Sequence, residues 1–494
     1  MVKMRRVTSF LFIALAVYFL TGMVGAGRYP RVWVDEGWVA EVGWTHAQGG
    51  PLGNPSHGSL HQYDRRVYWM PPMYFLTLTE AYRFAKDPLG GGRMVSLLIG
   101  ALELLVLCWV GLRVLSDRSG NRNQILWMLW IALAFTLDPT LWKVHRSIRF
   151  EPLTGLFLLS AVGSAAVGQG RSAWLGAAVF SALATLTHPT GILALPASLG
   201  TWIYRRPARR WGPVLGGAAV FMVVLLPYLA YLAQDRAFGF SNVLGQNAPH
   251  MTGRSEPIGW QWLHEWTRYR NYFAWPKLAL PCFFWAVTLF LGIRRRAPAW
   301  MLWTIAILAG GFACLPNKTE LYLTLMAPFL YLLAGWTGSR MSHRKAVWAG
   351  AILWLSVLAA ADLTLLHRNR DCRYREWAGA LVHGVPDKAS VAGTFITWFA
   401  FHDHPYYELH RRRAGDLALA HPDVVIWGDL HSMDPMFSRL RNELGPFLAA
   451  HSDTLGRSMS ACYGNAFVLR PHWNELDPRT AEGWERFGKG DPAS

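Results

Sequence analysis

The chain has 494 residues, of which 52% are hydrophobic and only 16% carry a charge. Soluble globular proteins carry roughly 25% charged residues, so this composition excludes an ordinary soluble enzyme and indicates a membrane protein with many spans. The net charge of +17 does not indicate a nucleic-acid partner, because the basic residues cluster between apolar segments. The five cysteines contain no Cys-x-x-Cys pair and thus give neither a zinc motif nor a redox motif.

The first apolar segment, residues 8–26, follows three basic residues near the start of the chain. It is longer than the core of about 7 to 15 residues in a secretory signal, so we interpret it as a retained helix that starts in the cytoplasm. Further apolar runs predict ten more spans, which makes eleven transmembrane helices in an all-α membrane domain. These runs are residues 93–112, 124–142, 152–169, 172–187, 190–204, 213–234, 276–293, 299–315, 321–337 and 346–366.

Alternating spans would bring the basic residues of every short loop to the cytoplasmic side, as the positive-inside rule requires. These residues are Arg113, Arg118, Arg122, Arg171, Arg205, Arg206, Arg209, Arg210, Arg294, Arg295, Arg296, Arg340, Arg344 and Lys345. The same topology brings residues 143–151, 187–191, 235–275 and 316–322 to the outer face. The basic set is rich in arginine and poor in lysine, which indicates a GC-rich bacterium and hence a multi-pass protein of its cytoplasmic membrane. From the alternating topology we expect any active site to lie outside the cytoplasm.

A long first outer loop, residues 28–92, contains no clean span. Within it, residues 37–47 and 73–84 have mixed apolar and polar faces, which is typical of helices that lie at a membrane surface. A full crossing by residues 73–84 is the alternative, but this segment is short, holds Glu80 and Arg83, and would invert every later loop. We therefore assign the loop to a membrane domain of residues 1–366.

After residue 366 the sequence is polar enough for a soluble domain, residues 367–494. Three segments predict β-strands, so we expect a small α/β domain outside the cytoplasm. Cys372 and Cys462 would then lie in an oxidising compartment, where a disulfide is one alternative and two buried thiols are the other. The predicted strands are residues 389–401, 422–428 and 464–470.

Two adjacent carboxylates, Asp35 and Glu36, follow directly on the first span. Acidic residues are mostly exposed, so a solvated loop start is the simple alternative to a catalytic role. Ionisable residues at several other span ends favour catalysis, because charges at membrane depth are costly and commonly functional. Carboxylates can accept a proton from an attacking hydroxyl, and cations such as Arg149 or Lys318 can stabilise a departing phosphate. This combination suits an inverting transfer of a sugar from a polyprenyl phosphate.

Four motifs resemble those of the GT-C superfamily of integral-membrane glycosyltransferases, in the branch that holds protein O-mannosyltransferases and the bacterial aminoarabinose transferase of lipid A. In chain order they are WVDEGWVA, VYWMPPMYFLTLTEAYRFAKDPLGGGRMVSLLIG, HRSIRFEPLTGLF and PNKTELYLTLMAPFL. The third motif departs from the family pattern, because Glu151 stands where the family carries Asp. The resemblance covers residues 5–366, with a looser match of the C-terminal domain.

By position, the resemblance implies that Asp35 is the catalytic base and that Glu36 assists or orients it. Glu151 would occupy the second acidic position of the family, near the donor or a metal. Some members of the superfamily use a divalent ion and others need none. These three carboxylates are thus the candidate ligands for Mg²⁺, Mn²⁺ or Zn²⁺, and the metal itself stays open.

The resemblance also implies a set of contacts to the donor. Lys318 and Tyr322 would contact the lipid phosphate or its first isoprene unit. Arg146 and Arg149 are nearby candidates for the same anion. His188 stands where some relatives carry a lysine and is a further candidate phosphate contact.

We therefore expect an inverting hexosyl or pentosyl transferase that uses a polyprenyl-phosphate-linked sugar. Its acceptor would be a glycolipid, a polysaccharide or a protein, and membrane lipid would surround the enzyme as a further partner. A lipid-linked sugar flippase or transporter is the alternative, but such a protein would place charges and broken helices at the bilayer midplane. The polar residues of this chain gather at span ends instead. The sugar, the acceptor and the carrier length stay open.

Overall fold

The computed structural model describes residues 2–57, 63–68, 70–115, 121–205, 211–234, 280–315, 319–341, 343–409, 414–428 and 435–476. Packing divides the chain into two compact units. The helical unit contains Met1–Val24, Tyr68–Leu76 and Arg93–Leu365, and the α/β unit contains Gly25–Val67, Thr77–Gly92 and Leu366–Ser494. Most of the predicted first outer loop, residues 28–92, thus packs with the C-terminal residues. The sequence predicted this loop as part of the membrane domain instead.

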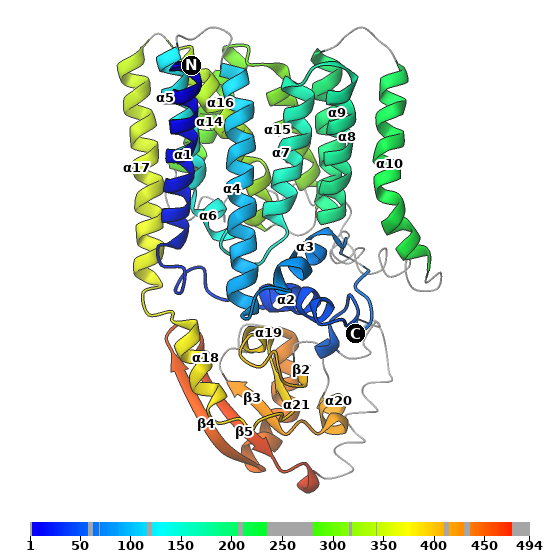
Figure 1. Ribbon diagram of the computed structural model, residues 1–494. Helices are drawn as coiled ribbons and strands as arrows, with labels where there is room; N and C mark the ends of the chain where they lie inside the picture. The colour runs from blue at the N-terminus through cyan, green and yellow to red at the C-terminus, as the bar shows by residue number, and fades with distance from the viewer. Residues whose placement is uncertain are drawn as a thin grey trace. The chain divides into compact units, whose positions relative to one another are not determined.

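Long helices build the helical unit (Figure 1). Among the described residues, three segments are long and apolar enough to cross a membrane, namely Pro88–Leu115, Gly212–Ala233 and Lys345–Arg368, and shorter apolar helices accompany them. The number of crossings, expected to be eleven, stays a prediction. The helices are α1 (Val2–Met23), α4 (Pro88–Leu115), α5 (Asn121–Thr136), α6 (Pro139–Val144), α7 (Glu151–Val167), α8 (Gly170–Thr187), α9 (Ala194–Arg205), α10 (Trp211–Ala233), α14 (Leu280–Arg294), α15 (Ala299–Ala313), α16 (Ala327–Ser339) and α17 (Arg344–Arg368).

The segment predicted as one span over residues 124–142 is broken in the structure. Helix α5 ends at Thr136, and Asp138 caps the separate helix α6. The Asp138 carboxylate accepts the N–H groups of Thr140 and Leu141 at 2.9 and 3.0 Å. An aspartate cap followed by proline starts a new helix, which the hydropathy of the segment does not reveal. Short 3₁₀ helices likewise form the first residues of two predicted spans, at η3 (Pro189–Leu193) and η5 (Glu320–Leu325).

The α/β unit holds a five-stranded sheet in the order β2-β1-β3-β5-β4. Strand β1 pairs in parallel with β2 and β3, whereas β5 is antiparallel to β3 and β4. The predicted segments at 422–428 and 464–470 form β3 and β5, but β2 and the polar edge strand β4 were not predicted because they lack a regular apolar alternation. The bounds are β1 (Val391–Gly393), β2 (Tyr406–Glu408), β3 (Val424–Gly428), β4 (Ser452–Ser460) and β5 (Gly464–Pro471).

The segment predicted as a strand over residues 389–401 is a strand only at its start. The N–H groups of Thr397 and Trp398 both donate to the Thr394 carbonyl, at 2.8 and 3.1 Å, and form the short helix α19 (Phe395–Trp398). Local hydrogen bonding and packing override the strand propensity of this segment. Other described helices of the unit are α2 (Val34–Ala47), η1 (Pro55–His57), α18 (Tyr374–Val382), α20 (Ala414–Ala420), α21 (Pro435–Ala450) and η7 (Trp473–Glu475).

Helix α3 (Met73–Tyr82) forms where the sequence predicted a membrane-surface helix over residues 73–84. In the helical unit, the Tyr74 hydroxyl lies 2.8 Å from the Ser96 hydroxyl, and the Phe75 ring packs edge-on against Phe150. Both α3 side chains are buried. These contacts attach the start of α3 to α4 and to the residue before α7.

Candidate active site

The two adjacent carboxylates of the first outer loop have different surroundings at the start of α2. Glu36 is fully buried, and its Oε2 accepts the backbone N–H of Trp33 at 3.1 Å. Glu36 is the third residue of the helix, and its side chain bonds to the backbone N–H of the N-cap residue. This N–H has no partner within the helix itself. Asp35 is exposed, one position earlier in the same turn. Glu36 therefore shapes the turn that presents the Asp35 carboxylate.

The strand end and loop around the Cys372–Cys462 disulfide anchor the residues just before α2. The two cysteines are bonded, with their Cα atoms 5.3 Å apart. The Val32 N–H donates to the Tyr463 hydroxyl at 3.1 Å, and the Arg31 guanidinium donates to the Cys462 carbonyl at 3.5 Å. Of the two alternatives left by the sequence, the structure has the disulfide, and it lies next to the anchor of the helix that carries Asp35.

The body of α2 is fixed from two sides within the α/β unit. A Cβ atom at Gly37 would lie 2.1 Å from the Phe395 carbonyl oxygen, so only glycine permits this approach of α2 to α19. On another side, the buried Glu41 carboxylate accepts the N–H and the hydroxyl of Ser56, at 2.9 and 2.6 Å, and the Asn54 amide at 3.0 Å. These contacts make α2 a rigid support for Asp35.

In the helical unit, Arg149 and Glu151 form a two-pronged ion pair at the start of α7. The Arg149 Nε and one terminal nitrogen donate to the two oxygens of Glu151 at 3.1 and 3.0 Å. The side chain of Glu151 is 4% exposed and that of Arg149 is 17% exposed. Such a pair fixes the plane of the guanidinium, which is the geometry that binds phosphate oxygens well.

His188 lies next to this pair, between α8 and η3. Its Nδ1 accepts the Thr190 N–H at 3.2 Å and lies 2.8 Å from the Thr190 hydroxyl. Burial lowers the pKa of His188 to about 4, while Glu151 and Arg149 act on it in opposite directions. The imidazole is therefore neutral near pH 7. Because Nδ1 is an acceptor, the proton of the neutral ring is assigned to Nε2, which can donate to an anion.

Aromatic rings and one further ion pair complete this cluster. The His188 ring lies 5.8 Å from Phe150 and 5.6 Å from the half-buried Tyr322, measured between ring centroids. The Lys143 ammonium lies 3.6 Å from the Glu320 carboxylate and connects α6 to η5. Lys318 lies outside the described residues. The structure thus brings together Arg149, Glu151, His188 and Tyr322, which the sequence had selected separately.

Arg146 has a different environment from Arg149. It is buried, donates to the Val24 carbonyl at 2.6 Å, and its guanidinium lies 4.1 Å from the centre of the Trp142 ring. The structure therefore uses Arg146 to connect the α6–α7 segment to the end of α1. A phosphate contact by Arg146 stays a prediction from the sequence.

The sequence did not single out Glu103, which holds the same segment from α4. Its Oε2 lies 3.2 Å from His145 Nε2, and both side chains are buried. A Cβ atom at Gly155 would lie 2.7 Å from Glu103 Oε1, so α7 approaches the carboxylate closely. An ionisable residue in the middle of an apolar helix was the signal that could have identified it.

The carboxylates proposed as metal ligands have other contacts. Both oxygens of Glu151 accept hydrogen bonds from Arg149, and one oxygen of Glu36 accepts a backbone N–H. Among the described residues, no three or more His, Cys, Asp or Glu side chains are grouped to hold a metal ion. Asp35 and Glu36 belong to the α/β unit and Glu151 to the helical unit. The mechanism proposed below uses only the chain's own side chains.

Comparison with solved structures gives matches over nearly the whole chain. ArnT from Cupriavidus metallidurans bound to undecaprenyl phosphate is similar at a TM-score of 0.67 and 15% identity, covering 94% of this chain and 97% of ArnT. The apo state of the same protein gives a TM-score of 0.63 at 15% identity, covering 95% and 98%. The archaeal oligosaccharyltransferase AglB from Archaeoglobus fulgidus, in complex with an inhibitory peptide and a dolichol-phosphate, gives 0.50 at 12% identity, covering 96% and 75%.

Sequence comparison adds no relative, because no family model and no curated protein matches the chain. At identities of 15% or less, the structural likeness establishes the fold. The agreement extends over the helical unit and the C-terminal residues, since 94% of the chain is covered. The chain has the GT-C fold that its four motifs predicted.

Proposed function

We propose that the chain is an inverting glycosyltransferase that moves a sugar from a polyprenyl-phosphate donor to an acceptor on the outer face of the cytoplasmic membrane. The observation that carries the proposal is the likeness of 94% of the chain to a structure bound to undecaprenyl phosphate. The cluster of Arg149, Glu151 and His188 supports it, because a fixed guanidinium beside a neutral N–H donor suits a phosphate.

Asp35 is the general base of this proposal. Its carboxylate is exposed at the start of a helix that is capped by Glu36 and anchored by Gly37. A carboxylate held in this way can take a proton from an approaching hydroxyl without reorganising its support. Glu36 acts as a positioning residue, because its side chain is buried and its Oε2 bonds the N-cap.

Arg149 and His188 hold the donor phosphate, and Tyr322 borders the first isoprene unit. The guanidinium supplies positive charge, and the His188 Nε2–H supplies a neutral hydrogen bond, since burial keeps this ring uncharged near pH 7. Both contacts strengthen as charge grows on the departing phosphate. Glu151 keeps the Arg149 plane fixed through its two hydrogen bonds. Lys318 is a further phosphate contact proposed from the sequence motif alone.

One displacement completes the transfer. The acceptor oxygen or other nucleophile attacks the anomeric carbon and gives its proton to Asp35. The bond between this carbon and the phosphate oxygen breaks, and the electron pair leaves with the polyprenyl phosphate. The sugar inverts its configuration, since nucleophile and leaving group occupy opposite faces. Asp35 then returns its proton to solvent.

The test compares glycolipids, polysaccharides and glycoproteins from cells with and without the gene by mass spectrometry. The proposal expects one class of molecule to lose a single sugar in the deletion and to regain it with the wild-type gene. Reversed anomeric configuration between donor and product is the second expectation. A deletion that changes only the side of the membrane on which a lipid-linked sugar accumulates, with no product losing a sugar, would indicate a flippase and refute the proposal.

A further inference from the structure

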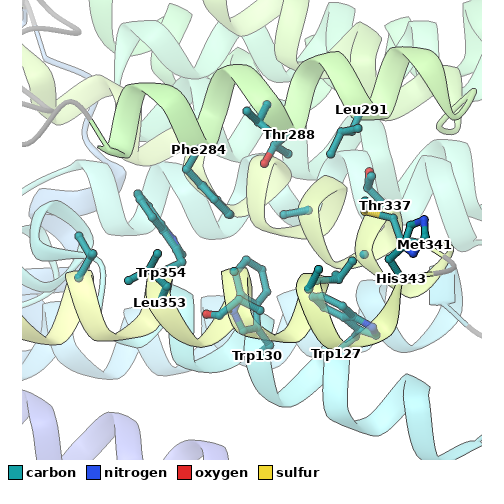
Figure 2. Close-up of a pocket in the computed structure, with 18 residues that line it drawn as sticks. Trp127, Trp130, Phe284, Thr288, Leu291, Thr337, Met341, His343, Leu353 and Trp354 are labelled. Carbon is teal, nitrogen blue, oxygen red and sulfur yellow. The ribbon is translucent and has the colours of Figure 1, made fainter.

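The helical unit contains a cavity of about 490 Å³ between α5, α14, α16 and α17. Figure 2 shows Trp127 and Trp130 of α5, Phe284 of α14 and Trp354 of α17 on its walls. The Phe284 and Trp354 rings are stacked, with centroids 4.1 Å apart. Its volume lies within the range of about 300 to 1,000 Å³ that is common for small-ligand sites. None of its lining residues belongs to the candidate active site.

The cavity extends along α17 from Ala346 to Val357. At the helical rise of 1.5 Å per residue, these positions are about 17 Å apart. The hydrocarbon core of a bilayer is about 30 Å thick, so the cavity runs for about the depth of one leaflet. Its length and aromatic walls therefore suit one hydrocarbon chain that enters from a single leaflet.

One end of the cavity lies at Thr337, Met341 and His343, and the threonine hydroxyl and the histidine ring give this end polar groups (Figure 2). The Thr337 side chain is 3% exposed, and within the described part of the chain its hydroxyl has no hydrogen-bond partner. Threonines in neighbouring helices donate to the carbonyl one turn earlier, as Thr304 does to Trp300 at 2.8 Å. A buried hydroxyl without such a bond is costly unless a ligand accepts from it. Thr337 thus indicates an acceptor, such as an ester carbonyl, at this end.

Positive charge gathers at the same end. Arg294 closes α14, Arg340 follows α16 and Lys345 lies in the first turn of α17, all at helix ends beside the cavity-lining stretches. The Arg340 guanidinium lies 4.0 Å from the centre of the Trp336 ring, and this contact holds the guanidinium near the end of α16. Figure 1 shows the α16–α17 connection at the same end of the bundle as the start of α1. The charge pattern therefore suits an anionic headgroup.

We propose that this cavity binds one acyl chain of an anionic phospholipid from the leaflet at the α16–α17 end. The chain lies along α17 among the tryptophans, its ester carbonyl accepts from the Thr337 hydroxyl, and its phosphate lies near Arg340 and Lys345. The site is separate from that of the polyprenyl-phosphate donor and does not depend on the proposed transfer.

Gly350 provides a direct way to fill the cavity. It lines the cavity, and a Cβ atom added there would have no atom within 4 Å. Gly350→Phe therefore occupies the space of the acyl chain without a clash at Cβ. Gly216 of α10 is the matched control, because a Cβ there also meets nothing within 4 Å and Gly216 does not line the cavity. Thr337→Val removes the hydroxyl at nearly constant volume and tests the polar end independently.

The experiment is native mass spectrometry of the full chain, delipidated and then titrated with phosphatidylglycerol or phosphatidylcholine. Wild type and Gly216→Phe should bind one phosphatidylglycerol about tenfold more tightly than phosphatidylcholine, given two or three basic groups near the headgroup. Gly350→Phe should lose this binding, and Thr337→Val should weaken it severalfold.

Three outcomes would overturn the proposal. In the first, Gly350→Phe binds phosphatidylglycerol like wild type. In the second, phosphatidylcholine binds as tightly as phosphatidylglycerol, which would mean that the site does not select an anionic headgroup. In the third, the lipid that purified wild type retains and Gly350→Phe loses is a polyprenyl phosphate. If Gly350→Phe does not elute as a folded species, unchanged binding by Thr337→Val is the result that refutes the assignment.

Discussion

The Arg149–Glu151 pair offers a test that separates stability from donor binding. Arg149→Met removes both hydrogen bonds to a carboxylate that is 4% exposed. An ionised carboxylate left in such surroundings keeps its desolvation penalty and loses its compensation. The Arg149→Met/Glu151→Leu double variant removes both charges, so no carboxylate remains to be compensated.

The expected magnitudes follow from burial. Breaking a buried ion pair costs about 3 to 5 kcal/mol, and the 17% exposure of Arg149 puts Arg149→Met near the lower value, about 3 kcal/mol. Replacing both partners with apolar side chains of similar size is commonly close to neutral. The double variant should therefore recover most of the free energy of unfolding that the single variant loses.

The assay measures unfolding in mixed micelles and the binding of undecaprenyl phosphate to the same preparations. Both variants should bind the lipid at least about tenfold more weakly than wild type, which corresponds to loss of about 1.4 kcal/mol of binding free energy. If the double variant is as unstable as Arg149→Met, the cost does not come from an uncompensated Glu151. If the double variant binds undecaprenyl phosphate like wild type, Arg149 does not hold the phosphate.

Three further changes test the supports of the site. Gly37→Ala places a Cβ against the Phe395 carbonyl, so it should cost about 1 to 3 kcal/mol of stability, measured by denaturant, and lower transfer. His188 has a folded pKa of about 4, below its ordinary 6.5, so the unfolded state binds the extra proton between these values. Stability should therefore fall by about 3 kcal/mol as pH drops from 6.5 to 4, and less in His188→Gln. Cys372→Ser opens a disulfide between residues 90 apart in sequence and should cost about 2 to 5 kcal/mol in chemical denaturation.

Each of these predictions has a control. Gly379 lies in α18, where a Cβ would meet nothing within 4 Å, so Gly379→Ala should leave stability unchanged or slightly raised. Equal loss in Gly379→Ala and Gly37→Ala would mean that close approach to α19 is not the cause. For His188, the same pH slope in wild type and His188→Gln would contradict its neutral state. For Cys372→Ser, wild type under reducing conditions should match the variant, and unchanged stability in both would contradict the structural role of the disulfide.

Much of the fold could be predicted from the sequence, because long apolar runs allow few alternatives in a membrane. The break between α5 and α6 was missed, since Asp138 acts through a cap that hydropathy averages away. The strand that begins at Val391 was predicted to be too long, because the packing of Phe395 against Gly37 brings together residues far apart in sequence. Local composition does not contain that contact.

The sequence selected several residues that the structure brings together, but it did not predict how they pair. Motif order selected Arg149, Glu151 and His188, and the structure adds that the first two share two hydrogen bonds and that Nδ1 of the third is an acceptor. Glu103 was missed because a single carboxylate within an apolar run carries no motif. Glu36, which the motif implied would assist or orient Asp35, also caps its own helix, and only backbone geometry reveals this cap.

The central claim is that Asp35 accepts the acceptor's proton. Asp35 is exposed in the first turn of α2, where the helix dipole contributes about 0.3 to 1 kcal/mol for a carboxylate, so Asp35→Asn should fold normally. Asp371→Asn is the matched control, because Asp371 is also exposed and pairs only with the adjacent Arg370 among the described ion pairs. The decisive measurement is transfer from a polyprenyl-phosphate sugar by purified protein. The account predicts that Asp35→Asn abolishes transfer while Asp371→Asn retains it, and normal transfer by Asp35→Asn would contradict the account.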